Sequence, residues 1–371
     1  MCFIFSLQAV MAADVQTDDT NNTILTTESV DVVNQSNDNP LLQSVDNDKL
    51  GEGEGSFAEL EADVSGTDVV LTRDYAYAGT DSGNAGIQLG GTKTIDGQGK
   101  VTIDANHQSR IFTIADGATI TIKGITFKNA FAQGNGGAIL ANGKIILEDC
   151  TFIDCSADGG NGGAVFLESS GSTITNCNFE NNRATKTADA TGSGGALMLA
   201  GSDIDVIDST FTNNKAGLNG GAICWIETVG HGYVESSVFN NNIANRSGGA
   251  IYWRGYNGTV EHSNFTNNHA LGTTLAKDTY DIPDIGGFGG AIMWTGPVGD
   301  VIDCRFENKE AHYNANANAS GRGGAVYLQG SSDVDCYDTT FDNCVFIGNI
   351  AGTNGGPIVS LEGARDGMLK T

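Results

Sequence analysis

A repeated four-residue motif, Gly-Gly-Ala/Pro-Ile/Val/Leu, constrains the fold of this chain more than any other feature. It occurs eight times, and each copy follows a phenylalanine and a short turn that is rich in asparagine. The copies begin at Gly136, Gly162, Gly194, Gly220, Gly248, Gly289, Gly323 and Gly355. The paired phenylalanines are Phe127, Phe152, Phe179, Phe211, Phe239, Phe265, Phe306 and Phe346. A repeat of this length indicates one supersecondary unit that stacks on itself.

The two arms of the repeat differ in how freely their lengths vary. From Gly-Gly to the next phenylalanine the spacing is 16, 17, 17, 19, 17, 17 and 23 residues. From phenylalanine to the following Gly-Gly it is 9 or 10 in five copies and 15, 24 and 17 in the other three. We therefore expect a structural coil whose insertions collect at one corner and form loops. These insertions are residues Arg183–Ser193, His269–Phe288 and Lys309–Arg322.

The arm of nearly constant length has the pattern of short β-strands. Between Gly220 and Asn242, apolar residues such as Ile223, Trp225 and Val234 are separated by glycine, glutamate and serine, without a helical period. Strands this short cannot bury an apolar face alone, so successive coils must stack and pair. A base period of about 26 residues suits three short strands and three turns per coil. The pattern therefore predicts an all-β, single-stranded parallel β-helix (a solenoid) of about ten coils.

Two kinds of turn residue fit this prediction. The asparagine of the Phe-x-x-Asn motif is expected to point inward and to bond its neighbours on the coils above and below. Its copies are Asn182, Asn214, Asn242, Asn268 and Asn349. The Gly-Gly pair is expected to supply a positive φ and a close approach of coils at a corner. It is a weak candidate for binding phosphate, because no helix follows it.

The residues outside the repeat and the net charge predict an exported protein. Residues 1–13 are an apolar run that ends in small residues, like the end of a signal peptide whose basic start is truncated. Residues 14–66 are polar and acidic, and we expect a disordered leader there. The repeat domain is expected over 67–361, and the tail, 362–371, is expected to be truncated because no polar cap is visible. A net charge of −26 argues against nucleic acid as a partner, and no stretch is long enough to span a membrane.

Four of the eight cysteines lie two residues before a repeat phenylalanine. Strands that stack at about 4.8 Å fall within the Cα separation of a disulfide, so Cys150–Cys177 and Cys304–Cys344 are candidate disulfides. The interpretation that we favour is a column of small buried residues. In other coils the same position is serine, at Ser209, Ser237 and Ser263. No metal site built from thiols is expected, because the cysteines and histidines lack zinc-site spacing.

The Gly-Gly-Ala-Ile and Phe-x-x-Asn motifs together resemble the repeat of chlamydial polymorphic membrane proteins. The chain resembles the adhesin-like surface proteins of methanogenic archaea more closely, because its opening segment also matches. That segment includes Val69-Val-Leu-Thr-Arg-Asp-Tyr-Ala-Tyr, Thr94-Ile-Asp-Gly-Gln-Gly-Lys-Val-Thr-Ile-Asp and Ile125-Thr-Phe-Lys-Asn. The resemblance covers residues 68–361 and implies a right-handed β-helix, in line with the general handedness of parallel crossovers. It also implies an extracellular, cell-surface location and a role in adhesion rather than a set of catalytic residues.

One outward-facing column is a candidate binding surface. Three and five residues after the first glycine of each motif the chain is apolar, and these positions should face inward, with Trp225, Trp253 and Trp294 stacked in the core. The position between them should face outward, yet it is apolar almost throughout. Corner loops can cover such a column; otherwise it is a binding face for a glycan or a partner protein. The candidate binding residues are Phe166, Tyr252, Met293 and Tyr327.

A catalytic alternative depends on one polar column, three residues before each repeat phenylalanine. Parallel β-helices include pectin-cleaving lyases and hydrolases, which need carboxylates, a base or a Ca²⁺ cluster on one face. His262 beside Asp303 and near Glu235 is the one constellation of this kind. The same position is polar on nearly every coil, so we interpret it as a solvated turn ladder. Ca²⁺ is a candidate ligand of the acidic column, and no other cofactor or metal is expected.

The sequence therefore predicts an exported, non-catalytic, adhesin-like protein of the cell surface. It would present a β-helix face and corner loops to glycans or to proteins of neighbouring cells. One alternative is a pectate-lyase-like carbohydrate-active enzyme, either a polysaccharide lyase or a hydrolase, and another is a structural surface spacer. An open apolar column at Tyr252 and Tyr327 would favour adhesion, and an exposed cation-binding cluster at His262 and Asp303 would favour the enzyme. If both are covered, the spacer is favoured.

Overall fold

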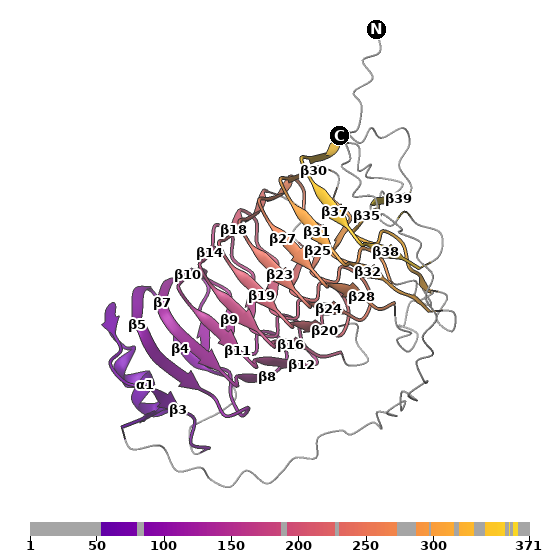
Figure 1. Ribbon diagram of the computed structural model, residues 1–371. Helices are drawn as coiled ribbons and strands as arrows, with labels where there is room; N and C mark the ends of the chain where they lie inside the picture. Colours follow the sequence, from indigo (N-terminus) through magenta and orange to yellow (C-terminus); the bar gives the residue numbers. More distant parts are fainter. Residues whose placement is uncertain are drawn as a thin grey trace, which may run out of the picture. The chain divides into compact units, whose positions relative to one another are not determined.

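The computed structural model describes residues 53–79, 85–186, 191–226, 230–272, 287–296, 298–314, 319–329, 338–352, 356 and 359–362. They belong to one compact unit, Lys49–Lys370, in which successive coils stack on one another (Figure 1). The coils pair in parallel and in register, so that Phe152 pairs with Phe127 on one side and with Phe179 on the other. The predicted right-handed parallel β-helix is confirmed. The expected signal peptide, 1–13, most of the expected leader and the tail from residue 363 lie outside the described residues.

Three parallel sheets run along the described coils. The ten-stranded sheet contains β4 (Ile87–Leu89), β6 (Phe112–Ile114), β9 (Ile139–Ala141), β13 (Val165–Leu167), β17 (Leu197–Leu199), β21 (Ile223–Trp225), β25 (Ile251–Trp253), β29 (Ile292–Trp294), β35 (Val326–Gln329) and β39 (Val359–Glu362). The eight-stranded sheet contains β8 (Phe131–Gln133), β12 (Ser156–Asp158), β16 (Arg183–Ala184), β20 (Lys215–Ala216), β24 (Ile243–Ala244), β28 (His269–Ala270), β32 (Glu310–Ala311) and β38 (Ile350–Ala351). Each of its strands directly follows the segment that carries a repeat phenylalanine. The three insertions therefore leave the coil from this sheet or just after it.

The nineteen-stranded sheet carries two segments per coil. It begins with β1 (Gly55–Ser56), β2 (Asp68–Val70), β3 (Tyr75–Ala76) and the long strands β5 (Thr92–Asp104) and β7 (Thr119–Lys128). The later coils contribute β10 (Lys144–Glu148), β11 (Thr151–Ile153), β14 (Thr173–Thr175), β15 (Asn178–Glu180), β18 (Ile204–Ile207), β19 (Thr210–Thr212), β22 (Gly232–Glu235), β23 (Val238–Asn240), β26 (Gly258–Glu261), β27 (Asn264–Thr266), β30 (Val298–Ile302), β31 (Arg305–Glu307), β36 (Asp338–Asp342) and β37 (Val345–Ile347). A separate antiparallel pair, β33 (Tyr313–Asn314) and β34 (Ala319–Ser320), lies in the third insertion.

Single residues in the left-handed conformation break each coil into short segments. One column of them separates the two segments of the nineteen-stranded sheet, with φ between 49° and 55°. Its members are Asp149, Asn176, Asp208, Ser236, His262, Asp303 and Asn343. Each coil therefore has four strand segments rather than the expected three. Asparagine and aspartate dominate the column because they tolerate a left-handed backbone better than other residues with a side chain.

The Gly-Gly corner has the two properties that were predicted for it. The first glycine of each described copy has a φ between 64° and 67°. The second glycine lies where a neighbouring coil approaches closely, and a Cβ at Gly163 would be 2.0 Å from the carbonyl oxygen of Gly195. Any side chain there would push two coils apart, which explains why the glycine recurs on every coil.

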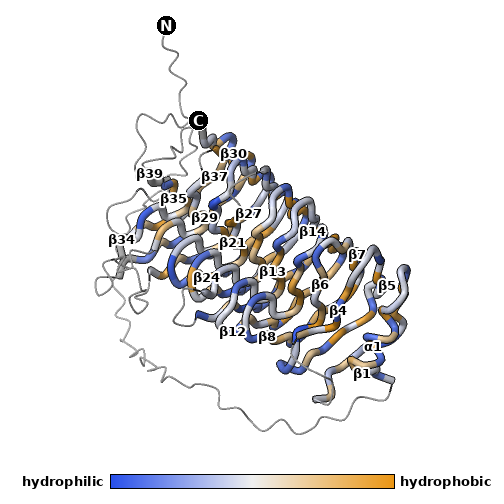
Figure 2. The backbone as a smooth tube through the Cα atoms, turned by 180° about the vertical axis from the view of Figure 1, so that it is seen from behind, coloured by the Kyte–Doolittle hydropathy of each residue, from blue (hydrophilic) through white to orange (hydrophobic). Residues whose placement is uncertain are grey.

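Ladders of identical side chains fill the interior. The repeat phenylalanines from Phe127 to Phe346 form one stack, with ring centroids 4.7–5.0 Å apart. Trp225, Trp253 and Trp294 form a second stack inside the ten-stranded sheet, and all three are almost fully buried, as predicted. In Figure 2 the apolar segments recur from coil to coil. The predicted asparagine ladder is also confirmed: Asn242 Oδ1 accepts the backbone N–H of Asn214 at 3.0 Å.

A short helix, α1 (Phe57–Asp63), precedes the first coil and packs two apolar residues, Phe57 and Leu60, into the end of the core. Ser56 and Glu59 form a capping box at its N-terminus, which explains where the helix begins. This finding corrects part of the expected disordered leader, 14–66, because ordered structure begins before residue 67. The physical reason is that the first rung of a solenoid exposes its core unless another element covers it. Within the described residues, no helix is long and apolar enough to span a membrane.

The cysteine column behaves as a column of small buried residues. Cys150, Cys177, Cys304 and Cys344 are free thiols, so the candidate disulfides Cys150–Cys177 and Cys304–Cys344 are not formed in this structure. Their sulfurs instead donate to main-chain carbonyls, such as that of Glu148, 3.3 Å from Cys150 Sγ. The serines of the other coils use their hydroxyl groups in the same way. The thiol of Cys150 together with burial raises the pKa of Cys177.

Candidate functional site

The outward-facing column of the ten-stranded sheet is not an open binding face. The alternation is as predicted, since Ile251 and Trp253 face inward and Tyr252 lies between them on the other side. Most of the column is nevertheless buried: the exposed fractions are 6% at Phe166, 3% at Met293 and 0% at Tyr327. The column forms two apolar clusters that are separate from the core of the coil.

Residues at the corner pack onto these clusters. Phe288, the last residue of the second insertion, stacks on Tyr327 with ring centroids 4.6 Å apart. The backbone at Phe288 bridges to Ser247 and Arg322 on the neighbouring coils, which fixes its ring over the sheet. Tyr252 packs against both clusters, and it is the one predicted binding residue that keeps appreciable exposed surface. Of the two alternatives left by the sequence, the structure supports coverage by the chain itself, and the candidate binding residues Phe166, Met293 and Tyr327 are buried.

The second predicted constellation lies on the exposed side of the nineteen-stranded sheet. His262 Nε2 is 3.3 Å from Asp303 Oδ2, and His262 Nδ1 is 3.6 Å from Glu261 Oε1. Ligand atoms of Glu235, Glu261 and His262 all lie within 4.8 Å of one another, so the sequence correctly placed Glu235 beside this histidine. The phenol of Tyr233 donates a hydrogen bond to Glu261.

The backbone accounts for the position of this constellation. His262 has a φ of 49° and is one member of the left-handed turn column, in which Ser236 precedes it and Asp303 follows it. Its side chain is 52% exposed, so water surrounds the imidazole and screens its charge interactions. These features are those of the solvated turn ladder that the sequence analysis favoured. The cluster offers an exposed imidazole and several carboxylates that lie close enough to share a cation, which is the feature expected to favour the enzyme alternative.

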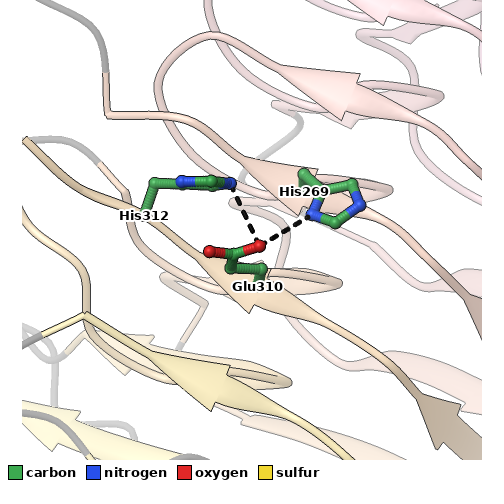
Figure 3. Close-up of side chains that lie close together, drawn as sticks. All are labelled: His269, Glu310 and His312. Carbon is green, nitrogen blue, oxygen red and sulfur yellow. Dashed lines mark ion pairs between the residues drawn. The ribbon is translucent and has the colours of Figure 1, made fainter. Parts of the chain in front are cut away.

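A third cluster was missed by the sequence analysis. His269, Glu310 and His312 lie together on the eight-stranded sheet, at the points where the second and third insertions begin (Figure 3). Burial lowers the pKa of His269, which favours the neutral imidazole. The chain contains only five histidines, and two of them fall four and six residues after a repeat phenylalanine. These nearby positions in successive repeats could have indicated that the two histidines lie close together. Instead, both residues were assigned to the insertions.

Two family models agree with the architecture. The family model described as the right-handed beta helix region matches residues 80–227, and that of the Chlamydia polymorphic membrane protein repeat matches residues 236–252. A search of curated proteins gave no match. Among solved structures, the A-module of the mannuronan C-5 epimerase AlgE4 of Azotobacter vinelandii is similar at 11% identity and a TM-score of 0.33. That similarity covers 85% of this chain and 98% of the epimerase module.

Proposed function

We propose that this chain is a non-catalytic, adhesin-like β-helix of an extracellular, cell-surface protein. It presents the eight-stranded sheet and the corner insertions to glycans or to proteins of neighbouring cells. The apolar column of the ten-stranded sheet is not the contact surface in this proposal, because the chain covers it. The match to the polymorphic membrane protein repeat over residues 236–252 supports a surface role of this kind.

The observation that carries the proposal is a contrast between the two sides of the eight-stranded sheet. Its inward column is alanine on one coil after another, and each of these alanines is at most 1% exposed. They are Ala132, Ala157, Ala184, Ala216, Ala244, Ala270 and Ala311. The outward column of the same strands changes character at almost every coil, through Phe131, Ser156, Arg183, Lys215, Ile243, His269 and Glu310. A uniform interior under a varied exterior is typical of a repeat scaffold that presents a recognition surface.

The test is to incubate the full chain with soluble and insoluble polysaccharides in the presence of Ca²⁺. Retained protein and newly formed chain ends are measured in the same samples. We expect retention without new ends, and we expect Lys215→Ala on the outward column to weaken it. Lys100→Ala, an exposed lysine of the nineteen-stranded sheet, is the matched control and should leave retention unchanged.

Two other outcomes separate the alternatives. New chain ends that disappear in His262→Ala would establish a carbohydrate-active enzyme and overturn the proposal. Absence of both retention and new ends, together with no binding to whole cells, would leave a structural spacer. Weaker retention in Tyr252→Ala but not in Lys215→Ala would move the contact surface back to the apolar column.

A further inference from the structure

Three potential ligand residues meet on the outer side of the eight-stranded sheet. Strands β28 and β32 are neighbours, and their register places His269 directly beside Glu310. The N–H of His312 donates to the carbonyl of Ala270 at 2.9 Å, so the pairing continues beyond β32. Ala270 and Ala311 are fully buried, and by alternation His269, Glu310 and His312 all lie on the outer side. The β-sheet register thus brings residues from two coils to one point.

The distances within this cluster suit ligands of a common metal ion. Glu310 Oε2 is 3.8 Å from His269 Nδ1 and 3.3 Å from His312 Nε2, and both imidazoles point toward that carboxylate (Figure 3). Hydrogen bonds between an imidazolium and a carboxylate are shorter, at about 2.7–2.9 Å. Two ligand atoms that are each about 2.1 Å from a tetrahedral ion are separated by about 3.4 Å. The three ligand atoms lie within 4.8 Å of one another.

An unsatisfied nitrogen points to a missing ligand. His269 Nδ1 is buried and has no hydrogen-bond partner among the described residues, although it faces Glu310. Buried polar atoms are rarely left unpaired, and an ion is one of the standard explanations when they are.

The cluster is confined to two coils. In the same outward column, Ile243 precedes His269 and Ile350 follows Glu310, so the adjacent coils offer no ligand. The cluster at His262 differs in this respect, because it occupies a turn position that carries a polar residue on seven successive coils, from Asp149 to Asn343. Its histidine is also more exposed, at 52% against 30% for His269. Ligand residues that occur on two neighbouring coils and are absent from this column on the coils beside them indicate a dedicated site.

We propose that His269, Glu310 and His312 together bind one divalent transition-metal ion of the zinc class. Two imidazoles and one carboxylate favour Zn²⁺ and similar ions over Ca²⁺ and Mg²⁺, which prefer oxygen ligands alone. Three protein ligands leave at least one coordination position for water or an external donor. The ion would join two neighbouring coils at the base of two insertions. This site is separate from any Ca²⁺ held by the acidic turn column, and its existence does not depend on the proposed function.

The test is a Zn²⁺ titration of the full chain by calorimetry, with Co²⁺ as a spectroscopic probe of the ligand geometry. We expect one tight site, and a tetrahedral or five-coordinate absorption spectrum with Co²⁺. Each of His269→Gln, Glu310→Gln and His312→Gln should weaken binding by about a hundredfold or more, since even loss of a supporting residue costs about 10–100-fold. His262→Gln is the matched control and should bind Zn²⁺ like the unmodified chain. A large excess of Ca²⁺ should fail to displace the ion.

The outcomes that overturn the proposal are equally definite. Failure of the unmodified chain to bind Zn²⁺ would refute it, as would unchanged binding in both His269→Gln and His312→Gln. A Co²⁺ spectrum dominated by thiolate charge transfer would assign the ion to cysteines and would also refute it. Circular dichroism of each variant shows whether the β-helix is intact. Should one variant not fold, the other two and the Co²⁺ spectrum of the unmodified chain still decide the question.

Discussion

Gly258 lies against the indole of Trp253, so that a Cβ on the glycine would be 2.3 Å from Cε2 and Cζ2 of the ring. Gly299 has the same relationship to Trp294, where the Cβ would be 2.0 Å from Cζ2. The coil that carries Leu199 at the tryptophan position carries Ile204 at the glycine position. On these coils, large and small residues of the ten-stranded and nineteen-stranded sheets are therefore matched across the interior.

This matching predicts the outcome of a double-mutant cycle. Gly258→Ile should destabilise the protein by about 1–3 kcal/mol or more, because a close-packed interior cannot admit the extra side chain. The backbone of Gly258 is outside the left-handed region, so space alone opposes the substitution. Trp253→Leu with Gly258→Ile recreates the pair found at Leu199 and Ile204 and should restore much of the loss. Urea unfolding measures the cycle; additive effects of the two substitutions would contradict the matching.

Each asparagine of the ladder should contribute strongly to the free energy of unfolding. Asn242 Oδ1 accepts the N–H of Asn214, and its Nδ2 donates to the carbonyl of Phe211 at 2.9 Å. Asn242→Ala would leave both buried backbone groups unpaired, at about 1–3 kcal/mol for each group. We expect a correspondingly lower urea midpoint. The control is Asn241→Gly, at the neighbouring exposed position with a φ of 54°, where glycine fits the backbone and stability should hardly change.

Lys309 interrupts that ladder and should weaken it. It occupies the position of Asn268 on the next coil, it is fully buried, and burial lowers its pKa to about 6. Its amino group donates to the carbonyl of Glu307 and does not offer the N–H of Asn268 the amide oxygen that an asparagine supplies on other coils. Lys309→Asn should therefore stabilise the chain by about 1–3 kcal/mol, because its amide oxygen restores an acceptor and the buried amino group is removed. Lys309→Met, which removes the buried amino group without restoring the acceptor, should give a smaller gain in chemical denaturation. A loss of stability in Lys309→Asn would show that the ladder does not extend through this coil.

Asp63, the last residue of helix α1, should make a pH-dependent contribution to the free energy of unfolding. Asp63 Oδ2 accepts from the phenol of Tyr75 at 2.7 Å and from Arg73 at 3.0 Å, and these bonds lower the pKa of Asp63 below its ordinary value of 3.8. A carboxylate with a lowered pKa stabilises the fold above its unfolded pKa, and this contribution is lost as the pH falls through the folded pKa. The stability difference between the unmodified chain and Asp63→Asn should therefore be largest near neutral pH and vanish in acid.

That contribution should be modest, below about 1 kcal/mol, because the Asp63 side chain is 40% exposed. Amide hydrogen exchange at Val64, whose N–H donates to Leu60 at the end of the helix, reports on this region directly. Glu61→Gln on the exposed side of the same helix is the control and should alter exchange little. A difference between the unmodified chain and Asp63→Asn that persists undiminished in acid would contradict the assignment.

The sequence by itself determined the features that repeat. The period, the phenylalanine stack, the inward asparagines and the Gly-Gly corner were all predictable, because each coil must satisfy the same stacking geometry as its neighbours. It also placed His262 beside Asp303, since equivalent positions in a repeat lie side by side on adjacent coils. A ladder of this kind turns sequence spacing directly into spatial proximity.

Only the tertiary structure decided what happens where the repeat is interrupted. The burial of Tyr327 by Phe288 depends on the path of an insertion that has no equivalent on other coils. The meeting of His269 and His312 depends on the strand register just before two insertions of different length. The matching of Trp253 to Gly258 depends on which residues face each other across the interior. In each case the partners belong to different sheets, insertions or coils, so the contact depends on how these parts of the chain pack together.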